Sequence, residues 1–281
     1  MKFLDSNNVA EAIAFAIPQL AAKLPADVRQ AMAHARDEER GERARIVLDQ
    51  LCDNCMIAGQ NMLPICQDTG TVWVCLEIGP DVNIHGDIFS EVNDVVAHAY
   101  TQNALRKSVV RDALFDRTNT QDNTPAFCEL RFVDESGAAH LHVMLKGGGS
   151  DNASCVTMLT PSAGKQGVID TVIARVKEKA SCACPPLVVG VGVGATFDKV
   201  AGLSKLALMR PLGTSNPDPE ADAFEQELLA AINETGIGAG ALGGKTTALA
   251  VRVKTAPCHI AALPVAVNMG CSALRRMTIE L

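Results

Sequence analysis

The sequence predicts a mixed α and β fold that begins with a helical segment. Apolar residues recur at helical spacing through most of residues 8–58. Runs rich in β-branched and apolar residues, which are typical of strands, follow at 71–79 and 186–194. Because both patterns continue toward the C-terminus, we expect helices combined with mixed sheets.

The composition suits one large domain or two small ones, since the chain has 281 residues of which 48% are hydrophobic. No repeat or interdomain linker is visible. We therefore expect a single domain over 1–281, with a helical segment at 1–60.

Charge and hydropathy exclude several classes of protein. Twenty-five Lys and Arg stand against 32 Asp and Glu, a net charge of −7. A general nucleic-acid binder would carry a basic stripe instead. The sequence shows no run of about 18 apolar residues and no signal peptide, so we expect a cytoplasmic protein with no membrane span.

The first half of the chain contains three expected helices and three expected strands. The helices cover 9–24, 25–39 with Pro25 near the first turn, and 42–60; Pro64 and the DTG sequence end this pattern. A strand at 71–79 precedes a helix over 88–107 that ends near Arg106. Strands at 125–135 and 140–147 are expected to form a hairpin around residues 134–137.

The second half alternates helices and strands. We expect helices over 165–180, 197–209 and 220–234, and strands over 186–194, 245–256 and 262–270. Residues 214–219 form a loop.

The chain has ten cysteines but no export signal, which favours reduced thiols, some of them metal ligands, over disulfides. Cys75, Cys128 and Cys155 lie in apolar runs, where a cysteine behaves as a small hydrophobe. Cys52 and Cys55 form a CxxC pair within a helical pattern, and no second pair completes a zinc site.

Three cysteines occur where the backbone leaves regular structure. Cys66 follows a proline and precedes a turn, Cys184 precedes Pro-Pro before a buried strand, and Cys271 ends a strand. Functional sites collect in such places, but loop cysteines are also commonly inert. Context alone leaves both interpretations open.

Two glycine-rich motifs resemble nucleotide loops without matching them. In GAGALGGKTT, Ala239 occupies the position of the first P-loop glycine. In GVGVG at 190–194, the spacing of the dinucleotide fingerprint fails, and close packing of a strand explains the glycines as well.

Six ordered motifs together resemble the α subunit of two-subunit class I iron–sulfur fumarate hydratases and the related L-tartrate dehydratases. The motifs are PICQDTG, DNTPAF, KGGGSDN, CPPLVVGVGVGAT, GGKTTALAV and APCHIAALPVAVNMGC. The resemblance extends from roughly residue 10 to the C-terminus.

This resemblance implies a [4Fe-4S] cluster on Cys66, Cys184 and Cys271. It also implies that Asp68 transfers a proton and that His259 is an active-site histidine. The implied substrate contacts are Gln67, Arg106, Gly149 and Asn152. Where single-chain members carry Lys after GGGS, an acidic residue and Asn, this chain has Ala153.

Each of these residues also has a structural interpretation. Asp68 can cap the DTG turn, His259 can be a strand-edge residue, and the glycines from 147 to 149 can form a plain turn. Arg111 competes with Arg106, because either guanidinium can bind a carboxylate bidentately.

The resemblance implies a hydro-lyase that reversibly hydrates fumarate to (S)-malate with a separate β subunit, as an α2β2 heterotetramer. L-tartrate dehydratase and mesaconate hydratase are alternatives within the same class. A cysteine-based redox or metal-binding protein is the alternative from a different class, and a nucleotide-dependent enzyme acting through Lys245 is a third.

Overall fold

The structure is a computed structural model that describes residues 2–281. Its helices are α1 (Ser6–Ala22), α2 (Ala26–Glu38), α3 (Glu42–Asn61), α4 (Val92–Gln102), α5 (Gly148–Asn152), α6 (Gly164–Lys179), α7 (Phe197–Ala207) and α8 (Pro219–Asn233). Its strands are β1 (Lys2–Leu4), β2 (Thr71–Ile78), β3 (Val82–Ile84), β4 (Phe127–Phe132), β5 (Ala139–Lys146), β6 (Cys155–Leu159), β7 (Leu187–Ala195), β8 (Ala248–Cys258), β9 (Leu263–Gly270) and β10 (Arg275–Glu280). The expected mixed α and β fold is confirmed.

The chain forms two compact units, neither of which is continuous in sequence. Unit 1 contains the chain up to Pro25 together with Cys55–Gly148 and Arg275–Leu281. Unit 2 contains Ala26–Asn54 and Gly149–Leu274. The chain therefore passes from unit 1 to unit 2 between two consecutive glycines of the KGGGSDN motif.

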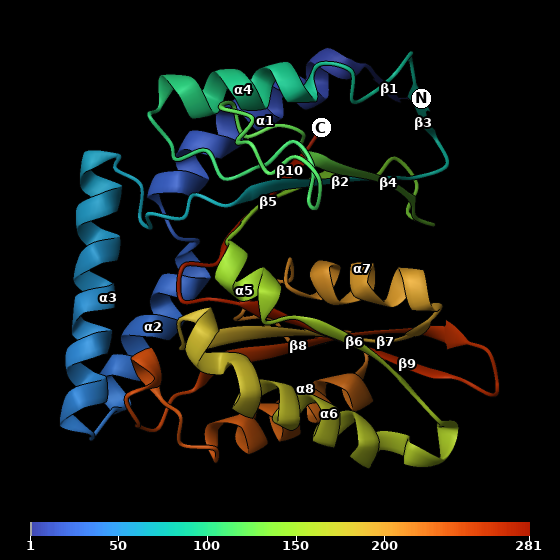
Figure 1. The fold of residues 1–281 in the computed structure, drawn as a ribbon. Coiled ribbons are helices and arrows are strands. Elements are labelled where there is room, and N and C mark those ends of the chain that lie inside the picture. Colours follow the sequence, from blue (N-terminus) through green and yellow to red (C-terminus); the bar gives the residue numbers. More distant parts are fainter. Residues whose placement is uncertain (1) are drawn as a thin grey trace. The chain divides into compact units, whose positions relative to one another are not determined.

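Unit 1 is built on a four-stranded mixed sheet with the strand order β10-β5-β2-β4. Strand β2 is antiparallel to β5 and parallel to β4, and β10 is antiparallel to β5. Helices α1 and α4 cover the same face of this sheet (Figure 1). Alternate residues of β2 and β5 form the core beneath them, as the two-residue period of a strand requires: Val72, Val74, Leu76, Leu141, Val143 and Leu145.

Helix α1 begins at a capping box in which Asp5 accepts hydrogen bonds from Asn7 and Asn8, and the Asn8 side chain accepts one from the Asp5 backbone. By length and composition, Ser6–Glu38 is the one helical stretch among residues 2–281 that is apolar enough to cross a membrane. The stretch comprises α1 and α2, and the apolar residues of α1 lie in the core of unit 1. A buried core helix meets the same criteria.

The expected hairpin between residues 125–135 and 140–147 is wrong. Both strands form, as β4 and β5, but β2 lies between them in the sheet. The connection crosses the end of β2, where Val133 donates to Ile78 and Gly79 donates to Ala138. A Cβ on Gly79 would lie 1.8 Å from the Glu135 carbonyl oxygen, so the crossing depends on glycine there.

The helix expected over 88–107 is shorter than predicted. Helix α4 spans Val92–Gln102 and ends at Asn103, so Arg106 and Arg111 lie in the following loop and not on a helix. Ala104 has a positive φ of 51°, which breaks the helical path. The other expected helices and strands are confirmed to within a few residues at their ends.

Unit 2 contains a second mixed sheet, with the strand order β6-β9-β7-β8. Strand β7 is parallel to β8 and antiparallel to β9. Helix α7 covers one face of this sheet, and α6 and α8 cover the other (Figure 1). Cβ atoms on Gly190 and Gly192 would lie 2.2 and 2.5 Å from backbone oxygens of α7, so these glycines serve close packing of strand and helix.

Candidate active site

One edge of the unit 1 sheet collects several of the predicted site residues. Thr71 at the start of β2 pairs with Lys146 at the end of β5, and Leu145 pairs with Arg275 at the start of β10. The loop that enters β2 therefore meets the glycine run that leaves β5. Cys66, Gln67 and Asp68 belong to this entering loop, which we call the CQDTG loop (66–70).

Polar contacts from distant segments fix the CQDTG loop. The Tyr100 hydroxyl of α4 donates to the carbonyl oxygens of Thr69 and Gly70, at 3.2 and 2.9 Å. The fully buried Asn123 donates to Gly70, and Thr69 donates to the Arg106 carbonyl at 2.5 Å. Burial raises the pKa of Tyr100, which keeps its hydroxyl protonated as a donor.

Asp68 contributes both to the turn and to the link with the glycine run. Its Oδ1 accepts a hydrogen bond from the Gly70 backbone at 3.0 Å, as the capping interpretation of the DTG turn predicts. Its Oδ2 accepts another from the Gly148 backbone at 2.7 Å. The half-buried carboxylate is therefore held between two segments far apart in sequence.

The other predicted residues of unit 1 are accessible to a ligand. Gln67 and Arg106 are exposed, and Cys66 is half-buried. The backbone of Arg106 is tied to the CQDTG loop through Thr69. The Arg111 guanidinium lies 3.9 Å from the Asp116 carboxylate within the same long loop.

One edge of the unit 2 sheet brings together Cys184 and Cys271. Strand β7 begins just after Cys184, and β9 ends just before Cys271. Because the two strands are antiparallel, with Val188 opposite Gly270, both cysteines lie at the same edge. The Ser272 backbone donates to the Cys184 carbonyl at 3.0 Å, which joins the two turns directly.

The turn that carries Cys184 also contacts Gly149. Cys184 adopts a left-handed backbone conformation with φ of 52° and is exposed. A Cβ on Gly149 would lie 2.8 Å from the Cys182 carbonyl oxygen, so glycine permits this contact.

Arg175 of α6 anchors the segment that contains Asn152. Its guanidinium donates to the carbonyl oxygens of Asn152, Ala153 and Ser154 at 2.7–3.0 Å. Ser154 in turn accepts a hydrogen bond from the Met269 backbone on β9. Gly149 and the exposed Asn152 are thus fixed at the same edge as Cys184 and Cys271.

His259 lies at the opposite edge of the unit 2 sheet. It follows the last residue of β8, Cys258, which pairs with Ala195 at the end of β7. The full length of β9, roughly 23 Å at 3.3 Å per residue, separates this edge from Cys271. The exposed His259 ring accepts a hydrogen bond from Ala261 at 3.1 Å. Within one chain, unit 2 does not bring His259 to the cysteines.

Two of the cysteines interpreted as core residues, Cys75 and Cys128, have raised thiol pKa values. All ten cysteines are thiols and not disulfides. Burial raises the pKa of Cys75 to about 12 and that of Cys128 to about 11, so both are protonated and inert at neutral pH. Among residues 2–281, no three His, Cys, Asp or Glu side chains form a group that could hold a metal ion. Cys66 belongs to unit 1, and Cys184 and Cys271 belong to unit 2.

The loop that resembles a P-loop binds a carboxylate of the protein itself. Glu39, at the end of α2, is 3% exposed and accepts hydrogen bonds from the backbones of Arg40, Gly41 and Lys245 at 2.8–2.9 Å. Lys245 also forms an exposed ion pair with Glu38. These contacts give the GGKTT segment a structural role.

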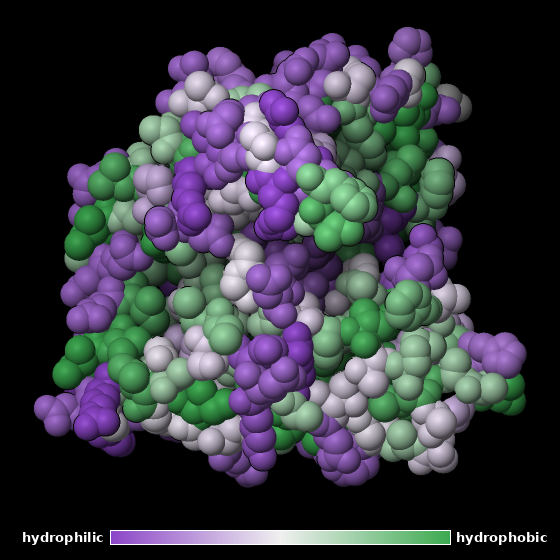
Figure 2. Space-filling view, in the orientation of Figure 1, coloured by the Kyte–Doolittle hydropathy of each residue, from purple (hydrophilic) through white to green (hydrophobic). Residues whose placement is uncertain are grey.

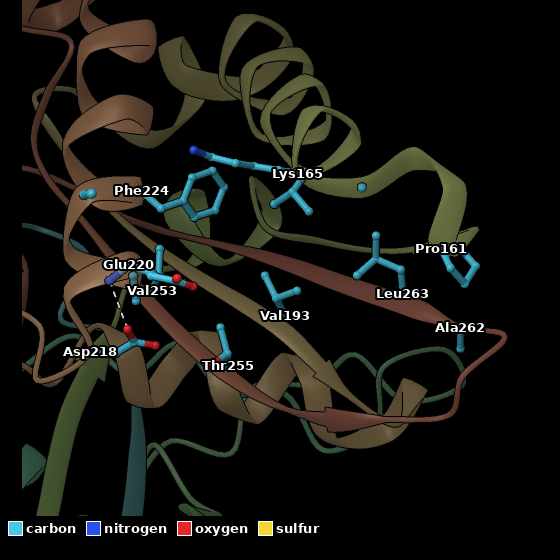
Figure 3. A pocket seen from close by; sticks show the side chains of 14 residues that line it. Pro161, Lys165, Val193, Asp218, Glu220, Phe224, Val253, Thr255, Ala262 and Leu263 are labelled. Atoms are coloured by element: carbon cyan, nitrogen blue, oxygen red, sulfur yellow. Dashed lines mark hydrogen bonds between the residues drawn. The ribbon is translucent and has the colours of Figure 1, made fainter.

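An apolar hollow of about 640 Å³ lies elsewhere in unit 2 (Figure 3). It is lined by residues of α6 and α8 and by the far ends of β7, β8 and β9, with Lys165 positioned over the Phe224 ring. None of the predicted site residues lines it. It lies at the end of the sheet opposite Cys184 and Cys271.

Sequence reasoning missed the residues that support these loops. Tyr100, Asn123 and Arg175 bind carbonyl groups of the CQDTG loop and of residues 152–154. Tyr100 and Arg175 lie in none of the six motifs, and Asn123 lies in DNTPAF but has no predicted role. One signal was present for Tyr100: it is the only tyrosine of the chain and falls in a helical pattern. A buried tyrosine usually finds a partner for its hydroxyl.

Comparisons with known proteins agree with the resemblance. The model of the fumarate hydratase (Fumerase) family matches residues 10–280. A protein of Methanocaldococcus jannaschii, named provisionally as an L(+)-tartrate dehydratase subunit alpha, is 38% identical over 259 residues, which cover 90% of each chain. The L(+)-tartrate dehydratase subunit alpha of Escherichia coli strain K12 is 30% identical over 276 residues, which cover 97% of this chain and 90% of that one.

These matches, with the loops just described, define a chain of the α-subunit type. The chain belongs to the fumarate hydratase (Fumerase) family.

Proposed function

We propose that this chain is the α subunit of a [4Fe-4S]-dependent hydro-lyase that reversibly hydrates fumarate to (S)-malate with a separate β subunit. The observation that carries the proposal is the placement of the motif residues. Cys66, Gln67 and Asp68 lie in one fixed loop at an edge of the unit 1 sheet, and Cys184 and Cys271 lie together at an edge of the unit 2 sheet.

The donor set suits an iron–sulfur cluster. Cys66, Cys184 and Cys271 are thiols in loops, and thiolates are the ligands that such clusters require. The joined turns of Cys184 and Cys271 would supply two of the three. When bound, a cluster held by three thiolates supplies one iron without a protein ligand, which is a Lewis acid.

The chain's own residues would bind the substrate and move a proton. Asp68 would exchange the proton on the carbon next to a substrate carboxylate, a contribution of about 10²–10⁴-fold for a positioned acid or base. The side chains of Gln67 and Arg106 would contact the substrate, as would the backbone of Gly149 and the amide of Asn152. His259 would reach such a site only if another chain provides it, because β9 separates His259 from Cys271.

The names of the relatives support L(+)-tartrate as a second candidate substrate. The relatives described above are named for L(+)-tartrate, which is also a hydroxylated four-carbon dicarboxylic acid. The same residues would serve its dehydration. Mesaconate, a methylated fumarate, is a third substrate of the same class.

A side-by-side assay tests this proposal. The chain would be reconstituted anaerobically with iron, sulfide and a candidate β chain from the same organism, then assayed with fumarate, mesaconate and L-tartrate. We expect the highest kcat/KM with fumarate. A higher value for L-tartrate would assign the second candidate, and no turnover of any of the three would refute the hydro-lyase function.

Cysteine variants test the cluster and the alternative of a redox or metal-binding protein. We expect Cys66→Ser, Cys184→Ser and Cys271→Ser each to abolish the visible absorption of the reconstituted cluster. Cys52→Ser and Cys55→Ser should retain it, because both residues lie within α3. Loss of colour with the α3 pair and not with the three loop cysteines would favour the redox alternative. Turnover that requires added nucleotide would favour a role for Lys245 instead.

The partner and the location are part of the same proposal. The relatives are named as α subunits, which supports a β partner, and we propose an α2β2 heterotetramer in the cytoplasm. Helix α3 carries the exposed apolar side chains Ile46, Met56 and Ile57, and Figure 2 shows hydrophobic, green surface along the side of the molecule where this helix lies. Contact with another chain would remove such side chains from water.

A further inference from the structure

Arg275, the first residue of β10, is a buried cation that the proposed mechanism does not use. The residue is 1% exposed and is among the largest fully buried side chains of the chain. Its Nε and Nη1 groups form no hydrogen bond. Unsatisfied charged donors are costly to bury, so a native structure that retains them calls for an explanation.

The strand register places Arg275 at the edge that carries Asp68. Arg275 pairs with Leu145, one residue before the end of β5, and Lys146 pairs with the start of β2. Since side chains alternate along a strand, Arg275 shares a face of the sheet with Met277 and Ile279, which pack against the core beneath α1 and α4. The guanidinium therefore lies at the end of this core, where the CQDTG loop enters the sheet.

Gly147 has no side chain at the point that lies between Arg275 and Asp68. A Cβ on Gly147 would lie 3.2 Å from Asp68 Oδ2 and 3.8 Å from Arg275 Nη2. Asp68 and Arg275 thus flank the same point without forming an ion pair. The Asp68 carboxylate already accepts the Gly70 and Gly148 backbone groups.

A small anion that binds the guanidinium would have to approach it from the side of Gly147. Gly148 is exposed, and Gly147 and Asp68 are half-buried, whereas Leu145 and Met277, which share the sheet face of Arg275, belong to the core or pack against it. Because a guanidinium presents its N–H groups in a planar fork, it binds a carboxylate more specifically than an ammonium does. A cation here would also offset the repulsion between Asp68 and a bound carboxylate.

We propose that Arg275 binds one carboxylate of the dicarboxylic acid, in the space beside Gly147. This inference rests on the proposed function and deepens it, because it adds a buried carboxylate receptor to the exposed Arg106. It places one end of the acid next to Asp68, the residue proposed to move the proton.

The test compares variants in the complete enzyme, assembled from this chain, its β chain and the cluster. Arg275→Gln removes the receptor, and Gly147→Ala fills the space while Arg275 stays in place. Arg276→Gln is the matched control: it removes a buried positive charge from the next residue of β10, whose side chain points to the opposite face of the sheet. Circular dichroism and urea unfolding check the fold of each variant.

Two measurements are needed, KM with the substrate and the dissociation constant of succinate, a saturated four-carbon dicarboxylate, by titration calorimetry. We expect Arg275→Gln and Gly147→Ala each to raise both KM and the dissociation constant by about 10- to 100-fold, which corresponds to the loss of a charge-assisted hydrogen-bonded pair. The preference for succinate over butyrate, which has one carboxylate, should fall in parallel. Arg276→Gln should leave both constants unchanged, and Arg275→Lys should recover part of the binding.

The possible outcomes separate this inference from the function it rests on. If Arg275→Gln and Gly147→Ala bind succinate as the unmodified enzyme does, the inference is wrong even where fumarate is turned over. If Arg275→Gln does not fold, undiminished succinate binding by Gly147→Ala overturns the inference by itself. If no dicarboxylate is turned over but succinate binding still depends on Arg275 and Gly147, the carboxylate site stands and the proposed reaction fails.

Discussion

The carboxylate of Asp68 combines a structural and a proposed chemical role, and one substitution separates them. In Asp68→Asn the side-chain oxygen can still accept the Gly70 backbone group, but the amide nitrogen cannot accept Gly148. Loss of one hydrogen bond should lower the free energy of unfolding by only about 1–2 kcal/mol. Loss of the acid or base should lower kcat by at least about 100-fold. Steady-state kinetics and urea unfolding measure the two effects.

A matched control for this substitution is Asp112→Asn. Asp112 also accepts backbone hydrogen bonds in a loop, from Leu114 and Phe115, but none of its contacts involves the CQDTG loop. It should change stability slightly and leave kcat unaltered. Turnover by Asp68→Asn equal to that of the control would show that Asp68 only shapes the turn.

Among individual residues of the candidate site, the sequence motifs identify some and give no signal for others. The motifs select Cys66, Cys184 and Cys271 from ten cysteines, and the strand order then explains why the last two meet. Arg275 carries no such signal, because an arginine in a strand pattern usually faces solvent. Its burial depends on the pairing of β10 with β5, two segments about 130 residues apart in the sequence.

At the scale of elements, a buried charge cluster attaches α8 to β8. Glu225 of α8 is fully buried and accepts hydrogen bonds from Arg210, Arg252 at 3.0 Å, Asn216 at 2.8 Å and the Val253 backbone at 2.7 Å. Removing one partner of such a cluster leaves the others charged and buried. We therefore expect Glu225→Gln to lower the free energy of unfolding by about 3–5 kcal/mol, measured by urea titration.

The control lies two residues further along the same helix. Glu227 forms an ion pair with Lys165 in which both side chains are largely exposed. Exposed pairs contribute about 0–1 kcal/mol, so Glu227→Gln should have a small effect. Equal losses from the two substitutions would mean that the cluster does not stabilise α8 as its burial implies.

The junction of α2, α3 and the GGKTT segment should make stability depend on pH. Burial alone would raise the pKa of Glu39. The hydrogen bonds from the backbone N–H groups of Gly41, Lys245 and Arg40 together lower the pKa by more than burial raises it, so it lies below its ordinary value. A carboxyl whose pKa is lowered by folding stabilises the protein above its unfolded pKa. This stabilisation is lost as the pH falls through the folded pKa.

Glu39→Gln should therefore be less stable than the unmodified chain at pH 7, and the difference should shrink as the pH falls below about 4.5, the ordinary pKa of a glutamate. Urea unfolding of both proteins across this range gives the comparison. A difference that stays constant with pH would mean that shape, and not the charge of Glu39, matters at this junction.

The elements were largely predictable because their signals are local. Periodicity predicts α1, α2 and α3, and apolar runs predict β2, β7 and β9. The pairing of strands was not predictable in the same way. Residues 125–147 look like a hairpin, but β2 separates the two strands, and the decisive contact is between Gly79 and the Glu135 carbonyl across 56 residues. No local pattern encodes such a contact.

At the scale of the whole molecule, both units gather their candidate site residues in the same way, through the pairing of antiparallel strands. In each sheet, the antiparallel arrangement of neighbouring strands brings loops that are distant in sequence to one edge. In unit 1 this edge carries the CQDTG loop, Gly147 and Arg275, and in unit 2 it carries Gly149, Cys184 and Cys271. The chain passes between the units four times, and two of these passages, at Gly148–Gly149 and Leu274–Arg275, are close to these residues in the sequence.

The site proposed for this chain comprises three thiolates, one acid or base and two arginines, and we propose that the β partner supplies the remaining groups. We therefore expect no turnover of fumarate by the isolated chain with a reconstituted cluster, and turnover once the β chain is added. A Cys66→Ser chain mixed with the β chain provides the control, because it should assemble, as seen by size-exclusion chromatography, without becoming active. Full activity of the isolated chain would show that residues 2–281 contain the complete site, and it would remove the reason for proposing a β subunit.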